Sequence, residues 1–484
     1  MSLDYSPEQF KKLISRSAEI IEEWYENGLR GSQIYRNPTP EEVRKRFDEP
    51  LPEAGEDPEK LLEIIREDVF ETSNFNPSPD YYGYITGGGN QAATIAELLK
   101  SALNQNNLKW HSAPANTEME KIVIRWICRF IGYPESSAGV LVSSGSVANF
   151  LNLAVMRKVK SPVDVAEEGL YSSARMTVYV SSEGHSSIEK GMDMLGMGKR
   201  YLRKIPVDGD FRIDINALEK AIEEDRSEGL LPVGVVGIAG TTNTGSVDPL
   251  QTLGEIAEKH NLWYIIDGAY GLPAAGTGLA GDLFDGLRMA DALLINPHKW
   301  FYVPFEAACV IVKEKKHLKN TFSLTPDYLK GGMAANERED LKDFNLQLTK
   351  DFKALKVWMT FKAYGAQKLR EAIENDCRTA RYARDRIEQT KEFELMAPVP
   401  LSIVCFRYLG RDGAVKGEEQ QIDRLNDRLL QLIEEDGRIF FAGTKIRGRT
   451  ALRINLTNHR RKNGDIDFLL NLLRKLGRKA EEDR

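Results

Sequence analysis

Between residues 80 and 360, short runs rich in β-branched residues alternate with amphipathic helical stretches, and this alternation limits the possible folds more than any other feature. It predicts an α/β fold with a doubly wound, mostly parallel sheet. Ligands of such sheets bind at the carboxyl ends of the strands, so the loops that follow these runs are candidate sites. The six clearest predicted strands are 138–143, 176–181, 233–240, 263–269, 291–296 and 307–313.

The segments on either side of this region have different patterns. Residues 1–79 contain two amphipathic helices, around 10–24 and 61–69, joined by a segment rich in proline and charge. A helix pair of this kind has little core of its own, so we expect it to pack on a second subunit. Residues 361–484 mix long helices with strands and predict a smaller α+β domain. The predicted units are therefore 1–79, 80–360 and 361–484.

Charge and cysteine usage exclude several classes of function. The chain has 66 basic and 72 acidic residues, a net charge of -6, and thus no excess of positive charge to attract nucleic acid or an anionic membrane. No run of about 18 apolar residues and no signal peptide is present. The four cysteines lack CxxC spacing, so neither a metal site nor a disulfide framework is predicted. We expect a cytoplasmic protein with a small-molecule ligand.

The loop after the first predicted strand begins with small residues. Ser144, Gly145 and Ser146 stand where "SSGSVANFLNLAVMRK" turns from strand to helix. Free backbone N–H groups and the helix dipole at such a point attract anions, which makes a phosphate site one interpretation. The alternative is an ordinary polar turn.

Three further polar residues follow predicted strands. Asp267 ends the apolar run in "IIDGAYG", where a carboxylate needs a positive or hydrogen-bonding partner. His185 lies among small residues in "SSEGHSSIEKG", where an imidazole has room to stack on a planar ring or to act as an acid or base. Thr242 stands in "GIAGTTNTGSVDPL". Taken singly, each of the three is also compatible with a structural role.

Lys299 in "NPHKW" connects these loops. A lysine held partly out of water has a lowered pKa and forms an imine with an aldehyde, which is how pyridoxal phosphate is bound. That cofactor also needs a phosphate cradle, an acidic partner for its ring nitrogen and a group on each ring face. The sequence contains a candidate for each of these parts.

Together these motifs resemble those of the group II pyridoxal-phosphate-dependent amino-acid decarboxylases, which include the aromatic-L-amino-acid, tyrosine, histidine and glutamate decarboxylases. "NPHKW", "SSEGHSSIEKG", "GTTNTGSVDPL" and "IIDGAYG" match in the family's order, and the match extends to "WHSAPANTEMEKIVIRWICRFIGYP" and "LRINLTNHR". The resemblance implies the aspartate-aminotransferase-like fold (fold type I), with a seven-stranded sheet and active sites shared between two subunits of a homodimer.

The resemblance also implies roles around the cofactor. Lys299 would carry pyridoxal phosphate as an imine, and Asp267 would pair with the ring nitrogen. His185 would cover one ring face, with Ala269 behind the other. The residues implied at the phosphate are Ser144, Gly145, Ser146, Asn296 and His298.

The implied substrate contacts are fewer. Thr242 would lie near the ring or the departing carboxylate, and Arg453 would meet the substrate carboxylate unless it forms a structural ion pair. The matching pocket positions are Tyr84, Ile85 and Thr86 in one subunit and Asn106 and Leu108 from its neighbour. Glycines in "PDYYGYITGGGNQ" leave room for a large side chain, which favours an aromatic amino acid, while Asn106 keeps glutamate or aspartate open.

One position departs from the family pattern. Leu341 in "NEREDLKDFNLQL" aligns with the tyrosine that usually delivers the proton, whereas Tyr328 aligns elsewhere. The favoured prediction is still decarboxylation of an aromatic L-amino acid to an amine, with His185, another tyrosine or water as the acid. The alternative is an aromatic acetaldehyde synthase, which uses oxygen. An aminotransferase and a non-catalytic dimer are disfavoured because "NPHKW", Asp267 and His185 are all present.

Overall fold

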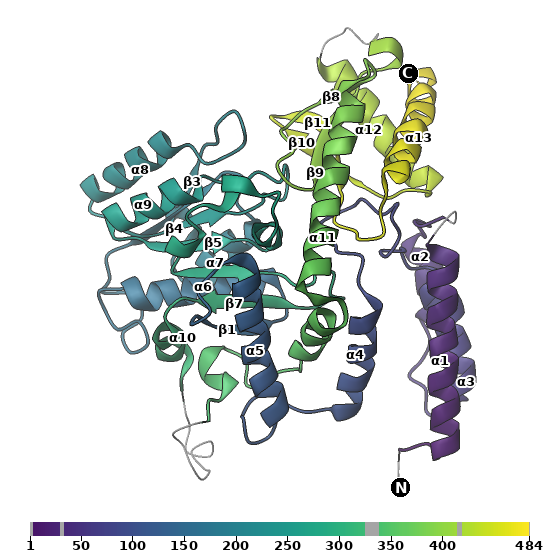
Figure 1. Cartoon of the computed structure of the whole chain (residues 1–484), viewed down its shortest axis with the longest axis horizontal. Coiled ribbons are helices and arrows are strands. Elements are labelled where there is room, and N and C mark those ends of the chain that lie inside the picture. Colours follow the sequence, from purple (N-terminus) through teal and green to yellow (C-terminus); the bar gives the residue numbers. More distant parts are fainter. Residues whose placement is uncertain (1–2, 30–32, 325–337, 414–418, 484) are drawn as a thin grey trace.

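The computed structural model describes residues 3–29, 33–324, 338–413 and 419–483. A large sheet with helices on both sides forms the body of the molecule, as Figure 1 shows. The C-terminal part lies above the body in that view, and α1 to α3 stand at its side. No helix in the described ranges combines the length and the apolar composition needed to cross a bilayer.

The body contains a seven-stranded sheet in the order β1-β7-β6-β5-β4-β2-β3. The pairs β2–β3, β2–β4, β4–β5 and β5–β6 are parallel, whereas β7 is antiparallel to both β1 and β6. This confirms the predicted mostly parallel sheet of seven strands. In chain order the strands are β1 (Ala138–Val142), β2 (Met176–Ser181), β3 (Leu202–Ile205), β4 (Leu231–Ile238), β5 (Trp263–Asp267), β6 (Ala292–Ile295) and β7 (Ala308–Val312).

Of the seven strands in this sheet, β3 is the one that the sequence pattern did not predict. It has four residues, "LRKI", and lies at the edge of the sheet, where Arg203 and Lys204 remain accessible to solvent. Short, charged strands are common at sheet edges because charge discourages pairing with another chain. Because two of its four residues are charged, β3 lacks the continuous apolar run by which the other strands were predicted.

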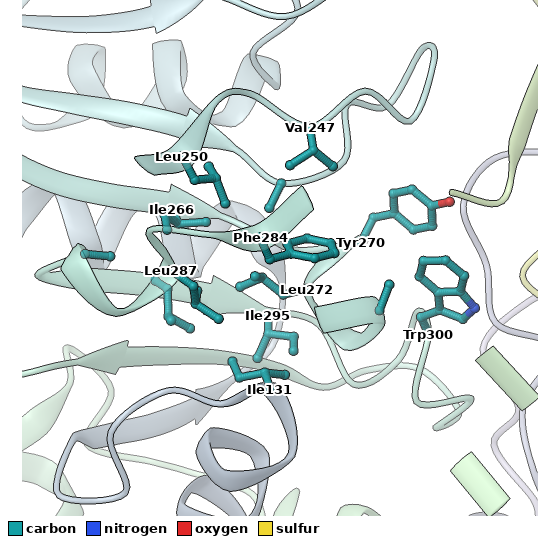
Figure 2. Close-up of a cluster of buried hydrophobic side chains, with 14 of the residues drawn as sticks. Ile131, Val247, Leu250, Ile266, Tyr270, Leu272, Phe284, Leu287, Ile295 and Trp300 are labelled. Carbon is teal, nitrogen blue, oxygen red and sulfur yellow. The ribbon is translucent and has the colours of Figure 1, made fainter. Parts of the chain in front are cut away.

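Both faces of the sheet are covered. Ile266 and Leu293 belong to one buried cluster, which includes side chains of α5, α8 and α9, and part of it is drawn in Figure 2. Ile265 and Leu294 belong to a second cluster with α6 and α7. Successive strand residues point to opposite faces, so a strand covered on both sides reads as a continuous apolar run. The helices of the body are α4 (Gln91–Leu103), α5 (Pro114–Ile131), α6 (Gly145–Lys160), α7 (Ser186–Met194), α8 (Ile215–Ser227), α9 (Leu250–His260) and α10 (Lys315–Phe322).

The N-terminal arm has an additional helix. The segment predicted as a proline-rich connection contains α2 (Pro40–Phe47), which Thr39 and Glu42 begin with a reciprocal capping box. Phe75 and Phe440 belong to a small cluster that connects the arm to the rest of the chain. The other arm helices are α1 (Pro7–Gly28), α3 (Pro58–Ile64) and the π-helix η1 (Ile65–Phe70).

The C-terminal part is a four-stranded antiparallel sheet with helices packed on it, in the order β10-β11-β9-β8. The predicted boundary after residue 360 falls inside α11 (Ala354–Glu388), near Gly365, whose φ of 73° interrupts the helix. The division into three units therefore stays a prediction. The remaining elements are β8 (Phe393–Leu395), β9 (Ile403–Tyr408), α12 (Glu419–Asp436), β10 (Ala442–Ile446), β11 (Arg449–Asn455), α13 (Asn463–Glu482) and the short helices η2 (Lys199–Tyr201), η3 (Leu272–Gly276), η4 (Gly281–Phe284), η5 (Leu287–Met289), η7 (Leu341–Phe344) and η8 (Arg411–Gly413).

Candidate active site

A cavity opens at the carboxyl ends of the central strands. The loops after β1, β2, β4, β5 and β6 all reach it, as expected for a doubly wound sheet. Eight residues singled out from the sequence line it: Gly145, Ser146, His185, Thr242, Asp267, Ala269, Asn296 and Lys299. The structure thus brings together side chains that are separated by up to 154 positions, 299 minus 145.

One end of the cavity is suited to an anion. It is formed by the start of the 16-residue helix α6, where Gly145 and Ser146 occupy the first turn. A Cβ added at Gly145 would lie 2.7 Å from Asn296 Nδ2, so a larger residue at this position would require the Asn296 side chain to move. Ser144 does not line the cavity; its hydroxyl accepts a hydrogen bond from Val147 N at 3.3 Å and caps the helix. These features fit a phosphate group.

His298 does not line the cavity but contacts Asn296, which does. Its Nδ1 accepts a hydrogen bond from Ala307 N at 3.1 Å, and burial lowers the pKa of His298 to about 3, so the ring is neutral. The proton of the neutral ring is then on Nε2, which is 3.5 Å from the amide of Asn296. The buried Oδ1 of Asn296 has no hydrogen-bond partner in the described part of the chain. A turned amide would satisfy Nε2–H with Oδ1 and leave Nδ2 to donate towards an anion.

Lys299 lines the cavity from the loop that follows β6. Burial lowers the pKa of Lys299, and the charge of Asp267 opposes this shift. A lowered pKa increases the fraction of neutral, nucleophilic amine at pH 7. The segment around Gly87 packs directly on this residue, because a Cβ at Gly87 would overlap the carbonyl oxygen of Lys299.

Asp267 lines the cavity from the last position of β5 and is only 6% exposed. Its Oδ1 accepts a hydrogen bond from Ala269 N at 3.2 Å, and its Oδ2 accepts one from Asn149 Nδ2 at 2.9 Å. Within the described residues no arginine or lysine forms an ion pair with it. A buried carboxyl group that is held only by neutral donors is available to pair with a cationic ligand group, such as a protonated ring nitrogen.

His185 caps the start of α7 and is exposed to the cavity. Its Nδ1 accepts a hydrogen bond from Ser187 N at 3.2 Å and lies 2.7 Å from Ser187 Oγ. Burial lowers the pKa of His185, Lys299 and Lys190 lower it further, and Asp267 opposes them. The ring is therefore neutral near pH 7, with its proton on Nε2.

Arg453 contacts the loop that contains Thr242, and Thr242 lines the cavity. Its Nη1 donates to Thr242 O at 2.8 Å, while its buried Nε has no partner in the described ranges. Burial lowers the pKa of Arg453. Among the described residues no carboxylate forms an ion pair with Arg453, so the structural ion pair considered as its alternative role is not found there.

The predicted pocket positions do not line the cavity. Tyr84 is 59% exposed and Ile85 is buried, while Thr86 lies between these extremes. Asn106 is exposed, and its Oδ1 accepts a hydrogen bond from Lys350 N at 2.9 Å. Leu108 accepts one from Lys342 N through its carbonyl oxygen at 3.2 Å. Their roles as substrate contacts stay predictions.

Leu341 is also outside the cavity. It is 1% exposed at the start of η7 and belongs to the same buried cluster as Phe344 and Leu318. An apolar side chain suits this position. Tyr328 lies outside the described residues.

The sequence did not reveal three polar residues of the cavity, Asn149, Glu183 and Ser187. Asn149 follows Gly145 by four positions, which places both on one face of α6, and this spacing was the available signal. Asn243 Nδ2 donates to Glu183 Oε2 at 3.0 Å.

The chain directly after Lys299 is anchored by the buried carboxyl group of Asp376. Asp376 Oδ2 accepts hydrogen bonds from Trp300 Nε1 at 2.9 Å and Tyr302 OH at 2.7 Å. The ring of Trp300 stacks on Tyr270, with centroids 4.9 Å apart, and Figure 2 shows these two side chains next to each other. Tyr270 OH in turn bonds to Ser402 Oγ, which joins this anchor to the C-terminal part.

We expect Asp376→Asn to change how stability depends on pH. Burial raises the pKa of Asp376 from 3.8 to about 7, against the hydrogen bonds of Tyr302 and Trp300. Because the folded state holds this proton and the unfolded state does not, the carboxyl lowers stability as pH rises from about 4 to about 7, and its effect is constant above that. Asparagine keeps the acceptor without the charge. The free energy of unfolding, measured by denaturation from pH 5 to 8, should become larger for the variant than for wild type, and the difference should grow to the order of 3 kcal/mol. Parallel stability curves for the two proteins would contradict the raised pKa.

With this geometry, the fold and the cavity define a pyridoxal-phosphate enzyme of fold type I. Residues 40–409 match the pyridoxal-dependent decarboxylase conserved domain. The chain belongs to the pyridoxal-dependent decarboxylase family, and pyridoxal phosphate is its cofactor. The family and fold predicted from the sequence are confirmed.

Individual relatives agree with this assignment. The chain is 29% identical over 482 residues to an aromatic-L-amino-acid decarboxylase of Bacillus atrophaeus, which covers 99% of this chain and 97% of that protein. It is 27% identical over 457 residues to a phenylacetaldehyde synthase of Petunia hybrida, covering 92% and 90%. The crystal structure of tryptophan decarboxylase of Catharanthus roseus with L-tryptophan superposes with a TM-score of 0.90 at 25% identity, covering 99% of this chain and 100% of that one.

Proposed function

We propose that this enzyme removes the carboxyl group of an aromatic L-amino acid and releases the amine and carbon dioxide. The observation that carries the proposal is that Lys299, Asp267 and His185 line one cavity in a chain of this family. The aromatic substrate is supported by the relative from Bacillus atrophaeus, which matches nearly the whole chain. Tryptophan, tyrosine, phenylalanine and DOPA are the candidates.

Pyridoxal phosphate, when bound, supplies an electron sink for the electron pair that remains when the carboxylate leaves as carbon dioxide. In our proposal Gly145, Ser146 and Asn296 hold its phosphate, and Lys299 holds its aldehyde carbon. Asp267 would pair with the ring nitrogen. Ala269, whose side chain is small, leaves room for a flat ring against the end of β5.

The other residues act on the substrate. Arg453 lies beside the Thr242 loop, and its Nε has no hydrogen-bond partner in the described part of the chain, which suits it to hold the substrate carboxylate. In our proposal His185 delivers the proton to the α-carbon through Nε2, the ring nitrogen that does not contact Ser187, from its imidazolium form, because a neutral imidazole is too weak an acid to give up its N–H. Ser144 and His298 do not line the cavity. In our proposal they position the residues that hold the phosphate, because Ser144 caps α6 and His298 lies beside Asn296.

Leu341 favours a second candidate, an aromatic acetaldehyde synthase. A leucine donates no proton, and this one is buried away from the cavity. Without rapid protonation, the electron-rich α-carbon is open to oxygen. The amino acid, dioxygen and water would then give an aldehyde, carbon dioxide, ammonia and hydrogen peroxide. The relative from Petunia hybrida carries this kind of name.

Product analysis under oxygen separates the two candidates. We expect amine and carbon dioxide in equal amounts, without oxygen uptake, from at least one of tryptophan, tyrosine, phenylalanine and DOPA. Glutamate and aspartate belong in the same panel, because an acidic substrate is the remaining alternative. An oxygen electrode and chromatography of the products provide the measurement. Oxygen uptake that equals turnover, with peroxide and aldehyde, would replace the first candidate by the second.

We also infer a homodimer in which each subunit completes the other's site. Apolar side chains on α4 and on the N-terminal arm support it, since they are too exposed for a monomer: Phe10 (56%), Ile95 (53%), Leu98 (54%), Leu99 (52%) and Leu103 (52%). Asn106 and Leu108 lie just after α4, outside the cavity of their own chain, where they would reach a neighbouring one. The four cysteines are free and buried, which fits the cytoplasm as the proposed location.

A further inference from the structure

Asn149 joins the two sides of the cavity through its amide nitrogen. It is 3% exposed, and its Nδ2 donates to Asp267 Oδ2 and to Ser187 Oγ, both at 2.9 Å. Ser187 Oγ lies 2.7 Å from His185 Nδ1. An amide nitrogen has two hydrogens, so these two contacts use its full donor capacity.

The direction of each hydrogen bond follows from the histidine end. Because Ser187 N donates to His185 Nδ1 at 3.2 Å, that ring nitrogen carries a lone pair. The hydroxyl of Ser187 therefore gives its hydrogen to Nδ1, and its oxygen must accept from Asn149. This requirement fixes the Asn149 amide with its nitrogen, and not its oxygen, towards Asp267. A turned amide would place two acceptors face to face at both contacts.

We propose that Asn149 is a positioning residue for the Asp267 carboxylate, holding it aimed at the ring nitrogen of pyridoxal phosphate. Asp267 is 6% exposed, so its two oxygens need hydrogen-bond donors in place of the water lost on burial. Ala269 N satisfies one oxygen, and Asn149 satisfies the other. The inference rests on the role of Asp267 in the proposed function.

The test compares pyridoxal phosphate with its 1-deaza analogue, in which carbon replaces the ring nitrogen. The dissociation constants of both ligands are measured by absorbance titration of the full-length protein freed of cofactor. Asn149→Leu removes both hydrogen bonds at similar volume. We expect the preference of the protein for pyridoxal phosphate over the analogue to fall about tenfold, as for the loss of a hydrogen bond to a charged group.

Asn152→Leu is the matched control. Asn152 lies on the same helix, is fully buried, and has no hydrogen-bond partner at either side-chain atom in the described part of the chain. The same change there should leave the preference unaltered. If Asn149→Leu weakens both ligands equally, its role is structural and the proposal is overturned.

Two further variants separate this inference from the proposed function. Asp267→Ala should abolish the preference; if it does not, the role of Asp267 fails, and the inference with it. If Asp267→Ala abolishes the preference and Asn149→Leu leaves it intact, only the inference fails. Should Asn149→Leu not fold, Asn149→Ala takes its place, because it also removes the donor to Asp267 and adds no bulk. We expect a loss of preference of about tenfold from that variant as well, and an unchanged preference overturns the proposal.

Discussion

Lys299→Ala should lower turnover by a factor of about 10³ or more and remove the visible absorption of the bound cofactor. A lysine held in the cavity acts at an effective concentration that no amine in solution reaches, about 10⁵–10⁸ M for well-oriented groups. Added methylamine should therefore restore little activity. Activity assays and absorption spectra of both proteins test this directly, and borohydride reduction of wild type should attach the cofactor to the peptide that contains Lys299.

The control for this change is the same substitution at a lysine outside the cavity. Lys259 is 61% exposed on α9 and forms a surface ion pair with Glu219 at 2.6 Å. Lys259→Ala should keep both the absorption and the activity. If Lys299→Ala retains the visible band, or if reduction labels another lysine, then Lys299 does not carry the cofactor and the proposed site is wrong.

The sequence was sufficient for the residues that directly follow buried strands. Asp267, Asn296 and Lys299 lie at or just after the ends of strands that read as continuous apolar runs. These runs identify the strands, and the doubly wound fold class then places the strand ends at one edge of the sheet. The family motifs added their chemistry. The edge strand β3 escaped because its two central residues are charged.

The sequence was not sufficient for residues whose roles depend on a partner far along the chain. Asn149 reads as an ordinary polar residue in a helix until the fold places Asp267, 118 positions later, beside it. Asp376 reads as a surface charge on a long helix, yet it is fully buried under Trp300 and Tyr302. For Leu341, alignment gave the position, but its burial required the structure.

The segment with Asn106 and Leu108 owes its position to a buried ion pair. Glu120 and Lys350 are 0% and 1% exposed at their side chains and bond to each other. The backbone of Lys350 accepts from Asn107 N at 2.8 Å and donates to Asn106 Oδ1 at 2.9 Å. Glu120 Oε1 also accepts from Leu141 N at 2.8 Å, at the end of β1. This one pair therefore ties the segment to the central sheet.

Lys350→Met should lower the free energy of unfolding by about 3–5 kcal/mol, because it leaves the Glu120 charge buried without its partner. Burial lowers the pKa of Lys350 and Glu120 opposes this, as expected for a pair in which each charge depends on the other. Glu120→Gln/Lys350→Met removes both charges and keeps an acceptor for Leu141 N, so it should recover more than half of the loss.

Urea denaturation of the three proteins measures these differences, with Lys259→Met as the matched control. That lysine belongs to an exposed pair, and breaking such a pair costs about 1 kcal/mol or less. Lys350→Met should also raise KM more than it lowers kcat, since the Asn106 segment would bind substrate without taking part in the chemistry. A loss no larger than that of Lys259→Met would mean that the buried pair does not hold the segment in place.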